Sequence, residues 1–540
     1  MKNKKAIVLL SFLVIGFSYC KAQEVKVFWG KQNPLEKGGI PQILAKKGDH
    51  LLGTSRNFKG NKVNIVKYSF DGLQVQNEYP IIGKAKEGQK VIDSKYHFED
   101  YAILKNKLYV GVSNYNKKTD LNSYFAQEIG DDGKLTGSLK KLGDISSTSR
   151  RNSGAFDVFE SEDSTKILMV SNPPYQKYAD EKFGFKIFDE NLKEINNLEI
   201  TLPYKDKYFS VSDYVLSKDG NIYALAKIEI PKKEKEKNEA GYYYEIISIN
   251  PNGKEQATEY EIKLSQKYIT DISFIEEGKS IVCAGFYNNI EIKGRSHDEI
   301  NGIFYLRINK ETKSIEANGI KDLDKQFIAE LTSTRKANKG RGIASTFKLK
   351  NFIQKDNGGA VLVSENSYDY EVRVCTTDPK TGAQSCHTEY HYVRNNIIVI
   401  NIEPTGSIKW YCNIPKYQHT VNDGGVYLSY MFSTAKDKVY FVYNDNAKNL
   451  DPEYIKKSEE VRPLGNVRKS VATLVTLSEK GTFEKKALFS NKENKVILLP
   501  SYSHTMEDGQ LIVPAIHTGI YCCFIPLKKG NYRLARFQFN

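Results

Sequence analysis

Short runs of alternating apolar and polar residues, each ended by a turn, fill most of this 540-residue chain. The segment 212–228, SDYVLSKDGNIYALAKI, shows the pattern, with two β-type runs on either side of a Lys-Asp-Gly turn. Similar segments begin at Glu99, Phe156 and Thr270. Alternation with a period of two, bounded by turn residues, predicts antiparallel strands joined by tight hairpins.

A polar residue stands just before the first apolar run of each segment and recurs at a regular interval. The four clearest examples are spaced 57, 56 and 58 residues apart, and all are aspartates: Asp100, Asp157, Asp213 and Asp271. Gln42 lies one such interval before Asp100, and counterparts at looser spacing complete a set of eight: Asn351, Ser429-Tyr430 and Ser501-Tyr502. The chain therefore contains eight similar units.

Each unit has a second half with a turn of its own. In 242–262, YYYEIISINPNGKEQATEYEI, an apolar run enters a glycine-containing turn and a second alternating run leaves it. Comparable segments occupy 122–142, 396–414 and 471–489. Glycine supplies the positive φ that tight hairpin turns require. One unit therefore predicts four antiparallel strands.

Eight consecutive four-stranded units, with almost no helical periodicity between them, predict an all-β fold. A single sheet of this kind cannot bury both faces, whereas sheets arranged radially pack on each other and leave only short edges. We therefore expect residues 23–540 to form one β-propeller of eight four-stranded blades, or seven if one unit is irregular. A pair of stacked β-sandwiches is the structural alternative, since sandwiches also space short strands regularly.

Two hairpins carry a resemblance to known propellers. The segment 400–415, INIEPTGSIKWYCNIP, resembles the repeat of quinoprotein-type propellers, which reads apolar-Asp-x-x-Thr-Gly-Lys-x-x-Trp. The segment 217–226, SKDGNIYALA, is similar to the Asp-Gly-Asn turns of many secreted propellers. The resemblance implies a secreted propeller superfamily with quinoprotein-like or WD40-like repeats, and a superfold of this kind does not fix one function.

The amino-terminal segment predicts export. MKNKK precedes the apolar run 6–17 and the small-residue site Cys20-Lys21-Ala22, which is the order of a secretory signal peptide cleaved after Ala22. We therefore expect residues 1–22 to be removed and the protein to be periplasmic, at the cell surface or extracellular. A lipoprotein is the alternative, although Tyr19 stands where a small residue should precede the modified cysteine. No later stretch approaches the roughly 20 apolar residues of a membrane helix.

The formal net charge is +14, and removal of four lysines with residues 1–22 leaves 14 − 4 = +10. Such a surplus can attract acidic glycans, anionic membranes or nucleic acid. The basic residues are nevertheless scattered among 65 acids rather than gathered in a stripe. This distribution favours a solvated surface, and no nucleic-acid partner is expected.

Three insertions lengthen the later intervals to roughly 72–80 residues: 325–345, 364–396 and 443–466. Insertions in regular repeats are common binding sites. The first places Gly340 and Gly342 among cations and could cradle an anion, but a solvated loop with at most one helical turn is favoured. The third begins with several Asn and Asp residues, for which turn formation is favoured over calcium binding.

The second insertion reads as a projecting hairpin with Cys375 and Cys386 on opposite arms, and we expect these cysteines to form a disulfide. The pairing sets a register in which His387, Glu389 and His391 share one face. They would lie opposite Val374, Val372 and Tyr370. Two imidazoles and a carboxylate could bind zinc, but alternate strand positions are nearly 7 Å apart, and an exposed polar face is favoured.

The dipeptide Cys522-Cys523 allows two interpretations, a vicinal disulfide or two unrelated half-buried cysteines. The resemblance to quinoproteins implies a cofactor beside such a pair, stacked on tryptophan, yet the chain offers only Trp29 and Trp410. No cofactor is therefore expected. The sequence contains no G-x-S-x-G nucleophile elbow, no H-E-x-x-H zinc helix, no C-x-x-C pair and no phosphate-binding P-loop.

The recurring polar residues are the candidate binding residues, because the first strand of each propeller blade lines the central channel: Asp100, Asp157, Asp213, Asp271 and Asn351. They could hold a cation or a basic ligand, or accept hydrogen bonds from nearby backbone N–H groups, and the structural role is favoured. The leading hypothesis is an exported, non-enzymatic propeller that binds a protein or glycan partner or acts as an envelope scaffold. The alternative is an envelope glycan hydrolase or lyase with carboxylates at the channel mouth.

Overall fold

The computed structural model describes residues 24–539 apart from twelve short internal segments: 36–38, 57–61, 85–87, 89, 148, 236–240, 254–256, 266, 290–298, 436–437, 458–460 and 518–529. The predicted signal peptide, residues 1–22, and the pair Cys522-Cys523 lie outside the described residues. No helix in the described part is both long and apolar enough to cross a membrane.

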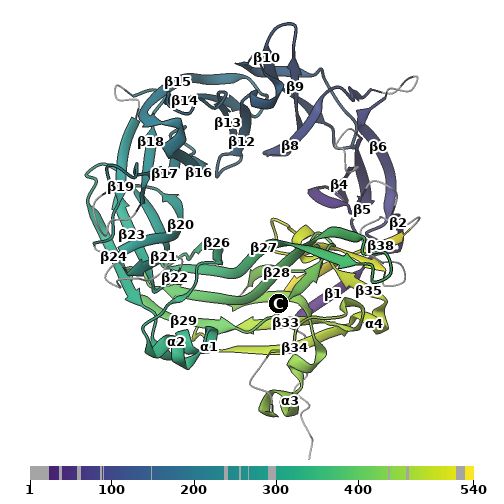
Figure 1. Ribbon diagram of the computed structural model, residues 1–540. Helices are drawn as coiled ribbons and strands as arrows, with labels where there is room; N and C mark the ends of the chain where they lie inside the picture. The colour runs from purple at the N-terminus through teal and green to yellow at the C-terminus, as the bar shows by residue number, and fades with distance from the viewer. Residues whose placement is uncertain are drawn as a thin grey trace, which may run out of the picture.

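Antiparallel sheets follow one another around a ring (Figure 1). The first four are built in chain order from β3 to β19, and β7 adds a parallel edge to the first of them. Their strands are β3 (Gln42–Lys47), β4 (His50–Arg56), β5 (Val63–Ser69), β6 (Val75–Gly83), β7 (Ile92–Asp93), β8 (His97–Leu104), β9 (Lys107–Asn116), β10 (Leu121–Ile129), β11 (Lys140–Ser146), β12 (Ala155–Glu160), β13 (Lys166–Asn172), β14 (Asp180–Asp189), β15 (Glu194–Lys205), β16 (Phe209–Leu216), β17 (Ile222–Glu229), β18 (Tyr242–Ile249) and β19 (Ala257–Ile262).

Three further sheets and one small ribbon continue the ring. The ribbon pairs β22 (Glu299–Ile300) with β25 (Ile343–Ala344). The sheets contain β20 (Lys267–Glu277), β21 (Ser280–Asn289), β23 (Gly302–Asn309) and β24 (Ile315–Asp322); then β26 (Phe347–Gln354), β27 (Ala360–Thr377), β28 (Gln384–Ile402), β29 (Ile408–Ile414) and β30 (His419–Val421); then β31 (Met431–Ala435), β32 (Lys438–Asp445), β33 (Val471–Leu477) and β34 (Phe483–Ser490).

The last sheet joins the two ends of the described chain. Its strands are β1 (Val25–Trp29), β2 (Asn33–Leu35), β35 (Val496–Leu498), β36 (His504–Thr505), β37 (Leu511–His517) and β38 (Gly530–Phe539). β1 pairs antiparallel with β38, with Val25 opposite Phe539. An amino-terminal outer strand therefore closes a sheet made otherwise of carboxy-terminal strands, which fixes the first sheet of the ring against the last.

The predicted β-propeller is confirmed by this arrangement. Within the described residues, eight sheets have four or more strands. The first seven repeat positions lie in or directly before the inner strands β3, β8, β12, β16, β20, β26 and β31, and the eighth, Ser501-Tyr502, lies in a 3₁₀ turn before the two-residue strand β36. Inner strands such as β8, β12, β16, β20 and β26 face the central opening in Figure 1. The stacked-sandwich alternative is wrong, because the sheets pack side by side around the opening rather than as two stacked layers.

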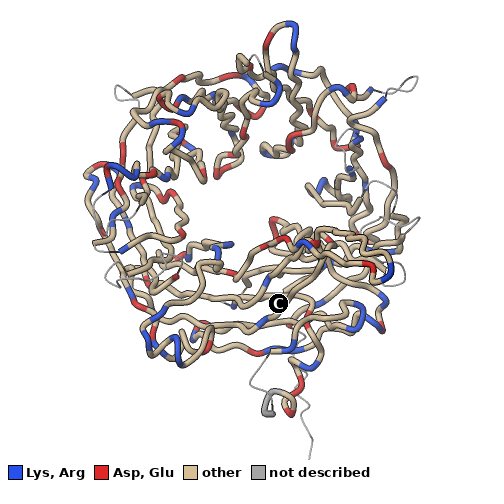
Figure 2. The backbone as a smooth tube through the Cα atoms, viewed as in Figure 1, with Lys and Arg blue, Asp and Glu red and all other residues tan. Residues whose placement is uncertain are grey.

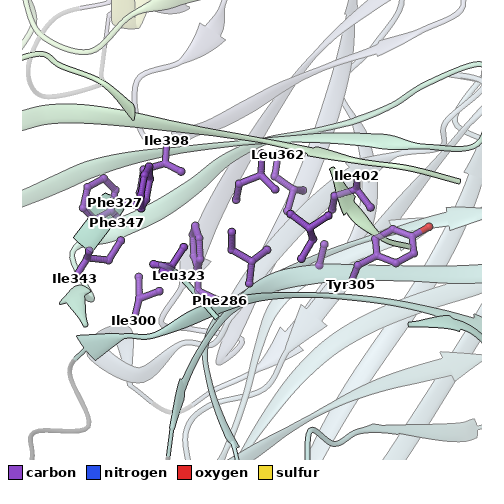
Figure 3. Packing of buried hydrophobic residues seen from close by; sticks show 14 of the residues in the cluster. Phe286, Ile300, Tyr305, Leu323, Phe327, Ile343, Phe347, Leu362, Ile398 and Ile402 are labelled. Atoms are coloured by element: carbon purple, nitrogen blue, oxygen red, sulfur yellow. The ribbon is translucent and has the colours of Figure 1, made fainter. Parts of the chain in front are cut away.

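Apolar side chains between neighbouring sheets hold the ring together. All residues of β21 except the last are buried, as expected for a strand covered on both faces. Figure 3 shows Phe286 and Tyr305 packed against Leu362, Ile398 and Ile402 of the next sheet. Burial of each such side chain contributes roughly 1.5–3 kcal/mol. The repeat therefore supplies both the strands and the interfaces between them.

The insertion at 325–345 differs from the expected solvated loop. It forms α1 (Lys325–Leu331) and α2 (Thr334–Asn338), capped by the side chains of Asp324 and Ser333. Phe327 and Ile328 of α1 are buried in the interface of Figure 3. The loop prediction was wrong because several apolar residues in a mostly polar segment carry the packing, Ala337 and Ile343 among them, which a charge-based interpretation overlooks.

The remaining helices are short and lie in connections. They are α3 (Pro452–Lys457), α4 (Asn491–Asn494) and the 3₁₀ turns Arg150–Asn152, Asp206–Tyr208, Ala447–Leu450, Val467–Lys469 and Pro500–Tyr502. The insertion at 443–466 thus begins inside β32 and continues into helical turns. Asn446 and Asp451 accept backbone hydrogen bonds from Lys448 and Glu453, which confirms the predicted turn chemistry.

Candidate binding sites at the channel mouth and on the β27–β28 hairpin

The recurring polar residues mark a repeated irregularity of the inner strands. Pairing with the second strand shifts register in β8 between Phe98 and Tyr101, in β16 up to Asp213, in β20 up to Asp271 and in β26 up to Asn351. β12 is the regular member of this group, with Asp157 directly opposite Val170. A β-bulge turns side chains away from their regular direction and increases local twist. The recurrence in the sequence therefore follows a structural feature of the blades.

Each recurring side chain has a different polar partner. Asp100 accepts a hydrogen bond from the Tyr124 hydroxyl at 2.5 Å, and Asp157 accepts one from the Asn172 amide at 2.8 Å. Asp213 accepts the backbone N–H of the next residue. The predicted residues thus occupy equivalent strands, but these contacts tie each one into its own surroundings rather than around a common ligand.

Two members of the series reach across to the next sheet. Asp271 accepts the backbone N–H of Leu349 at 2.8 Å, and Leu349 adjoins the bulge of β26. Asn351 accepts a hydrogen bond from the Tyr430 hydroxyl at 3.2 Å. These bonds link neighbouring blades at their inner edges, in keeping with the structural role favoured from the sequence.

Burial shifts the ionisation of this inner ring of acids. Burial raises the pKa of Asp100 to about 6, with Glu99, Asp157 and Glu160 adding to the rise and the Tyr124 hydrogen bond opposing it. Burial also raises the pKa of Asp213 and Asp271. These acids therefore hold protons at higher pH than exposed carboxyls do.

The structure also brings together two carboxyl groups, Glu181 and Asp206, that the sequence analysis did not single out. Burial together with the neighbouring Asp206 raises the pKa of Glu181 to about 7. Glu181 lies in β14, and Asp206 lies in the 3₁₀ turn that leads to β16. The two are 25 positions apart, so no local motif could have linked them.

A cavity of about 270 Å³ opens between β26 and the starts of β31 and β36. Its lining is mostly polar and combines one ammonium, one amide, several hydroxyls and one apolar ring: Lys350, Asn351, Ser429, Tyr430, Phe432, Ser503 and Thr505. Lys350 is the residue displaced by the bulge of β26. Ser429 has φ +65°, a conformation that non-glycine residues rarely adopt. Of these residues, the sequence had indicated Asn351 as a binding residue.

A buried polar network lies directly behind Ser429. The Ser429 hydroxyl donates to Glu365 Oε2 at 2.9 Å, and Glu365 Oε1 accepts from the Lys416 ammonium at 2.8 Å. Lys416 also donates to the Arg394 carbonyl and to Gln418. Glu365 and Arg394 belong to β27 and β28, so the cavity wall is connected to the base of the long hairpin.

The insertion 364–396 forms the predicted projecting hairpin, which extends β27 and β28 beyond their sheet (Figure 1). Cys375 and Cys386 form a disulfide, as expected. The register is also confirmed: Val374, Val372 and Tyr370 pair with His387, Glu389 and His391. β30 adds a third strand along β28, with Val421 opposite His391.

A row of stacked rings crosses this hairpin. Tyr370 stacks on His391 with ring centroids 4.6 Å apart, and His391 Nδ1 lies 2.9 Å from His419 Nε2. Burial and the neighbouring His391 lower the pKa of His419. His419 was not part of the predicted face, because it reaches His391 from a strand 28 residues later.

The hairpin face does not bring His387, Glu389 and His391 together as a metal-ligand group. Among all the residues that the structure describes, no group of three or more His, Cys, Asp or Glu is arranged to hold an ion. The zinc interpretation of His387, Glu389 and His391 and the calcium interpretation of 443–466 therefore gain no support. The anion cradle at Gly340 and Gly342 is filled by the chain itself, since Gly342 N–H and Arg341 both bond the Glu299 carboxylate.

Charge is spread around the ring. Figure 2 shows basic and acidic residues interspersed on all sides, without a stripe of one sign. This distribution agrees with the solvated surface expected from the sequence. Local combinations such as Lys350 beside neutral hydrogen-bonding groups are therefore more informative than the overall charge.

No protein-family model and no curated protein matches the chain. Among solved structures it is similar to a prolyl endopeptidase at 8% identity and a TM-score of 0.38, over 89% of this chain and 55% of that one, so it spans about half of that enzyme's length. It is similar to the β-propeller domain of the Trilobed protease from Pyrococcus furiosus at 12% identity and a TM-score of 0.33, over 86% and 98% of the two chains. It is also similar to a europium-containing methanol dehydrogenase at 9% identity and a TM-score of 0.40, over 94% and 93%. These TM-scores carry no argument about activity, and the propeller assignment follows from the order and ring arrangement of the sheets.

Proposed function

We propose that this chain is an exported binding propeller whose cavity between β26, β31 and β36 holds a small, hydroxyl-bearing anion, such as the acidic sugar unit of an envelope glycan. The signal-like amino terminus supports export. The cavity supports the ligand class, because an ammonium supplies charge attraction while an amide and several hydroxyls supply hydrogen bonds.

One observation carries the proposal. Four inner strands place an aspartate at the recurring position, whereas β26 places Asn351 there and puts Lys350 just before it. Lys350 is close enough to Asp271 to oppose the rise in pKa that burial causes in that carboxyl, but it makes no ion pair or hydrogen bond within the described residues. The inner ring thus changes from acidic to cationic at the cavity.

The hydroxyl groups of the cavity suit a saccharide. Ser429 already donates its proton to Glu365, which leaves its oxygen lone pairs available to accept from a ligand hydroxyl. Ser503 and Thr505 add two further hydroxyls to the lining, and Phe432 offers an apolar surface for the C–H face of a sugar ring. An inorganic anion would use the charge and the hydroxyl donors but leave the apolar surface of Phe432 without a role.

The test is titration calorimetry of the purified chain with glucuronate and galacturonate oligosaccharides, compared with neutral glucose oligosaccharides of equal length. We expect acidic saccharides to bind and Lys350→Gln to weaken binding at least tenfold. Lys348→Gln is the matched control, because Lys348 lies on the same strand but does not line the cavity. Equal binding of neutral and acidic saccharides, no binding of either, or equal loss in both variants would overturn the proposal.

A second candidate function is hydrolysis or lyase cleavage of an envelope glycan. The raised pKa values of Asp100 and Glu181 favour it, since catalytic acids need carboxyls that retain a proton near neutral pH. Release of reducing ends from acidic polysaccharides by the wild-type chain, lost in Asp100→Asn or Glu181→Gln, would support this function. Binding without turnover would support the binding propeller.

A further inference from the structure

The β27 strand has one open edge. Its first part pairs with β26 from Ala360 to Asn366, and Ser367 still donates its N–H to the Thr346 carbonyl. Beyond Ser367, pairing within the described residues continues only on the β28 side, as far as Thr377 opposite Gln384. The ten residues 368–377 therefore present a main-chain edge without a partner strand.

The geometry of the disulfide identifies which backbone groups face this edge. The Cα atoms of Cys375 and Cys386 are 4.1 Å apart, as in a non-hydrogen-bonded antiparallel pair, where Cα atoms are closer than in a hydrogen-bonded pair. The N–H and C=O of Cys375 therefore point away from β28. Because strands alternate with a period of two, those of Asp369, Glu371 and Arg373 point the same way. Two bonds agree with this alternation, from Ser367 N–H outward and from Asp378 N–H toward Ala383.

This edge lacks several features that normally prevent strand addition, although it carries the charged residues Asp369, Glu371 and Arg373. Residues 368–377, YDYEVRVCTT, contain no Pro, Gly or Lys, and their pairing with β28 is continuous. Tyr368, Tyr370 and Val372 are 39%, 41% and 37% exposed. Together with Tyr390, Tyr417 and Val421, they make up half of the twelve exposed large hydrophobic residues in the described part of the chain. A long unpaired edge with exposed apolar side chains on one face is a site for pairing with another strand.

We propose that this edge pairs antiparallel with the same edge of a second copy of the chain, about a two-fold axis at Val372. In that register Glu371 of each copy lies opposite Arg373 of the other, and neither side chain has an ion-pair partner within the described part of one copy. Asp369 is already bonded to Arg394 at 2.6 Å, which leaves Glu371 and Arg373 as the free charges on that face.

The opposite face of the strand is self-complementary in the same register. Val372 meets Val372 of the second copy, and Tyr370 meets Val374, so apolar side chains come together on one face while opposite charges pair on the other. The four residues with outward N–H and C=O groups in each copy exchange about eight main-chain hydrogen bonds. The edge therefore selects a second copy through both its backbone and its side chains. This interface is independent of the proposed ligand cavity.

The experiment is sedimentation velocity of the full chain from about 1 to 100 µM. We expect a monomer–dimer equilibrium that Glu371→Arg and Arg373→Glu each weaken at least tenfold, because each change opposes like charges across the axis. Mixing the two variants restores dimers, since one chain then carries cations at both positions and the other carries carboxylates at both. Glu371→Pro removes an outward N–H without breaking a bond to β28 and also abolishes dimers.

A second measurement fixes the register. Val372→Cys should form a disulfide-linked dimer on mild oxidation, because the axis places the two positions directly opposite each other in a non-hydrogen-bonded pair. Thr376→Cys is the matched control and should not cross-link.

The proposal is overturned if the wild-type chain stays monomeric throughout, if the charge variants dimerise as the wild type does, or if the mixed variants remain monomers. Dimers that survive all three substitutions would assign self-association to another surface, and capture of a different protein by this edge without dimerisation would assign it another occupant.

Discussion

The Lys416 ammonium lies 2.8 Å from Glu365 Oε1 at the base of the β27–β28 hairpin, and neither side chain is exposed to solvent. The other oxygen of Glu365 accepts from Ser429, and Lys416 makes two further hydrogen bonds. Burial lowers the pKa of Lys416, while the carboxylate beside it acts in the opposite direction. A buried pair of this kind resists the loss of one partner, because the remaining charge then has no compensation.

Lys416→Met should therefore destabilise the propeller by about 3–5 kcal/mol. The physical cause is the Glu365 carboxylate, which is left charged and buried without its cation. The measurement is the free energy of unfolding from urea denaturation followed by tryptophan fluorescence. Combining Lys416→Met with Glu365→Gln should recover part of the loss, because no unpaired charge remains.

Lys438→Met is the matched control for this pair. Lys438 bonds Glu24 at 3.0 Å, but its side chain is 46% exposed, so its loss should cost no more than about 1 kcal/mol. Similar losses for both lysines would show that solvent reaches the Glu365 pair and would contradict its buried character.

Stability should depend on Asp100 between pH 4 and pH 6. Because the pKa of Asp100 is raised to about 6, the folded chain holds a proton that the unfolded chain has lost, and stability falls as pH rises through this interval. Asp100→Asn cannot titrate and still accepts the Tyr124 hydrogen bond. Relative to wild type, the variant should gain up to about 3 kcal/mol between pH 4 and pH 7. The check is denaturation at both pH values, and an unchanged difference would show that Asp100 ionises normally.

The disulfide should stabilise the hairpin and not the ring. Cys375→Ala with Cys386→Ala removes a cross-link worth roughly 2–3 kcal/mol to this short loop. The tip of the hairpin lies outside the hydrophobic clusters between blades, so its opening is local. Hydrogen exchange across 368–377 should accelerate by about 30- to 150-fold while the melting temperature stays nearly constant. A large fall in melting temperature would mean that the hairpin supports the blades.

The fold was predictable because it repeats. Eight weak signals at similar spacing reinforce each other, so the inner strands at Asp100, Asp157 and Asp213 could be placed although single strands are ambiguous. The hairpin register was predictable for a related reason, since one disulfide between Cys375 and Cys386 fixes the pairing from Ser367 to Thr377, as far as the register shift before Ser367.

The cavity was mostly unpredictable from sequence, because its residues come from three strands more than 70 positions apart. Lys350 lines the cavity because of a bulge in β26, and Ser429 because of its positive φ. The neighbouring sequence does not predict either feature. His419 and Lys416 likewise meet partners on distant strands. The recurring aspartates could be located but not interpreted, since their partners, such as Tyr124 and Leu349 N–H, depend on how the inner strand bulges.

The contact between Asp100 and Tyr124 also explains a glycine in the second strand of its blade. A Cβ atom at Gly111 would overlap both the Tyr124 hydroxyl and Asp100 Oδ1, so the two partners of the hydrogen bond occupy the space of a side chain. Gly111→Ala should push them apart and cost about 1–3 kcal/mol, as overpacking does.

Gly184→Ala is the matched control in a strand of the next sheet, where the nearest atom lies 3.4 Å away, and its effect should be within about 1 kcal/mol of zero. The melting temperatures of the two variants decide the matter. If Gly111→Ala melts no earlier than Gly184→Ala, Tyr124 does not fill this position, and the hydrogen bond between Tyr124 and Asp100 is not formed as described.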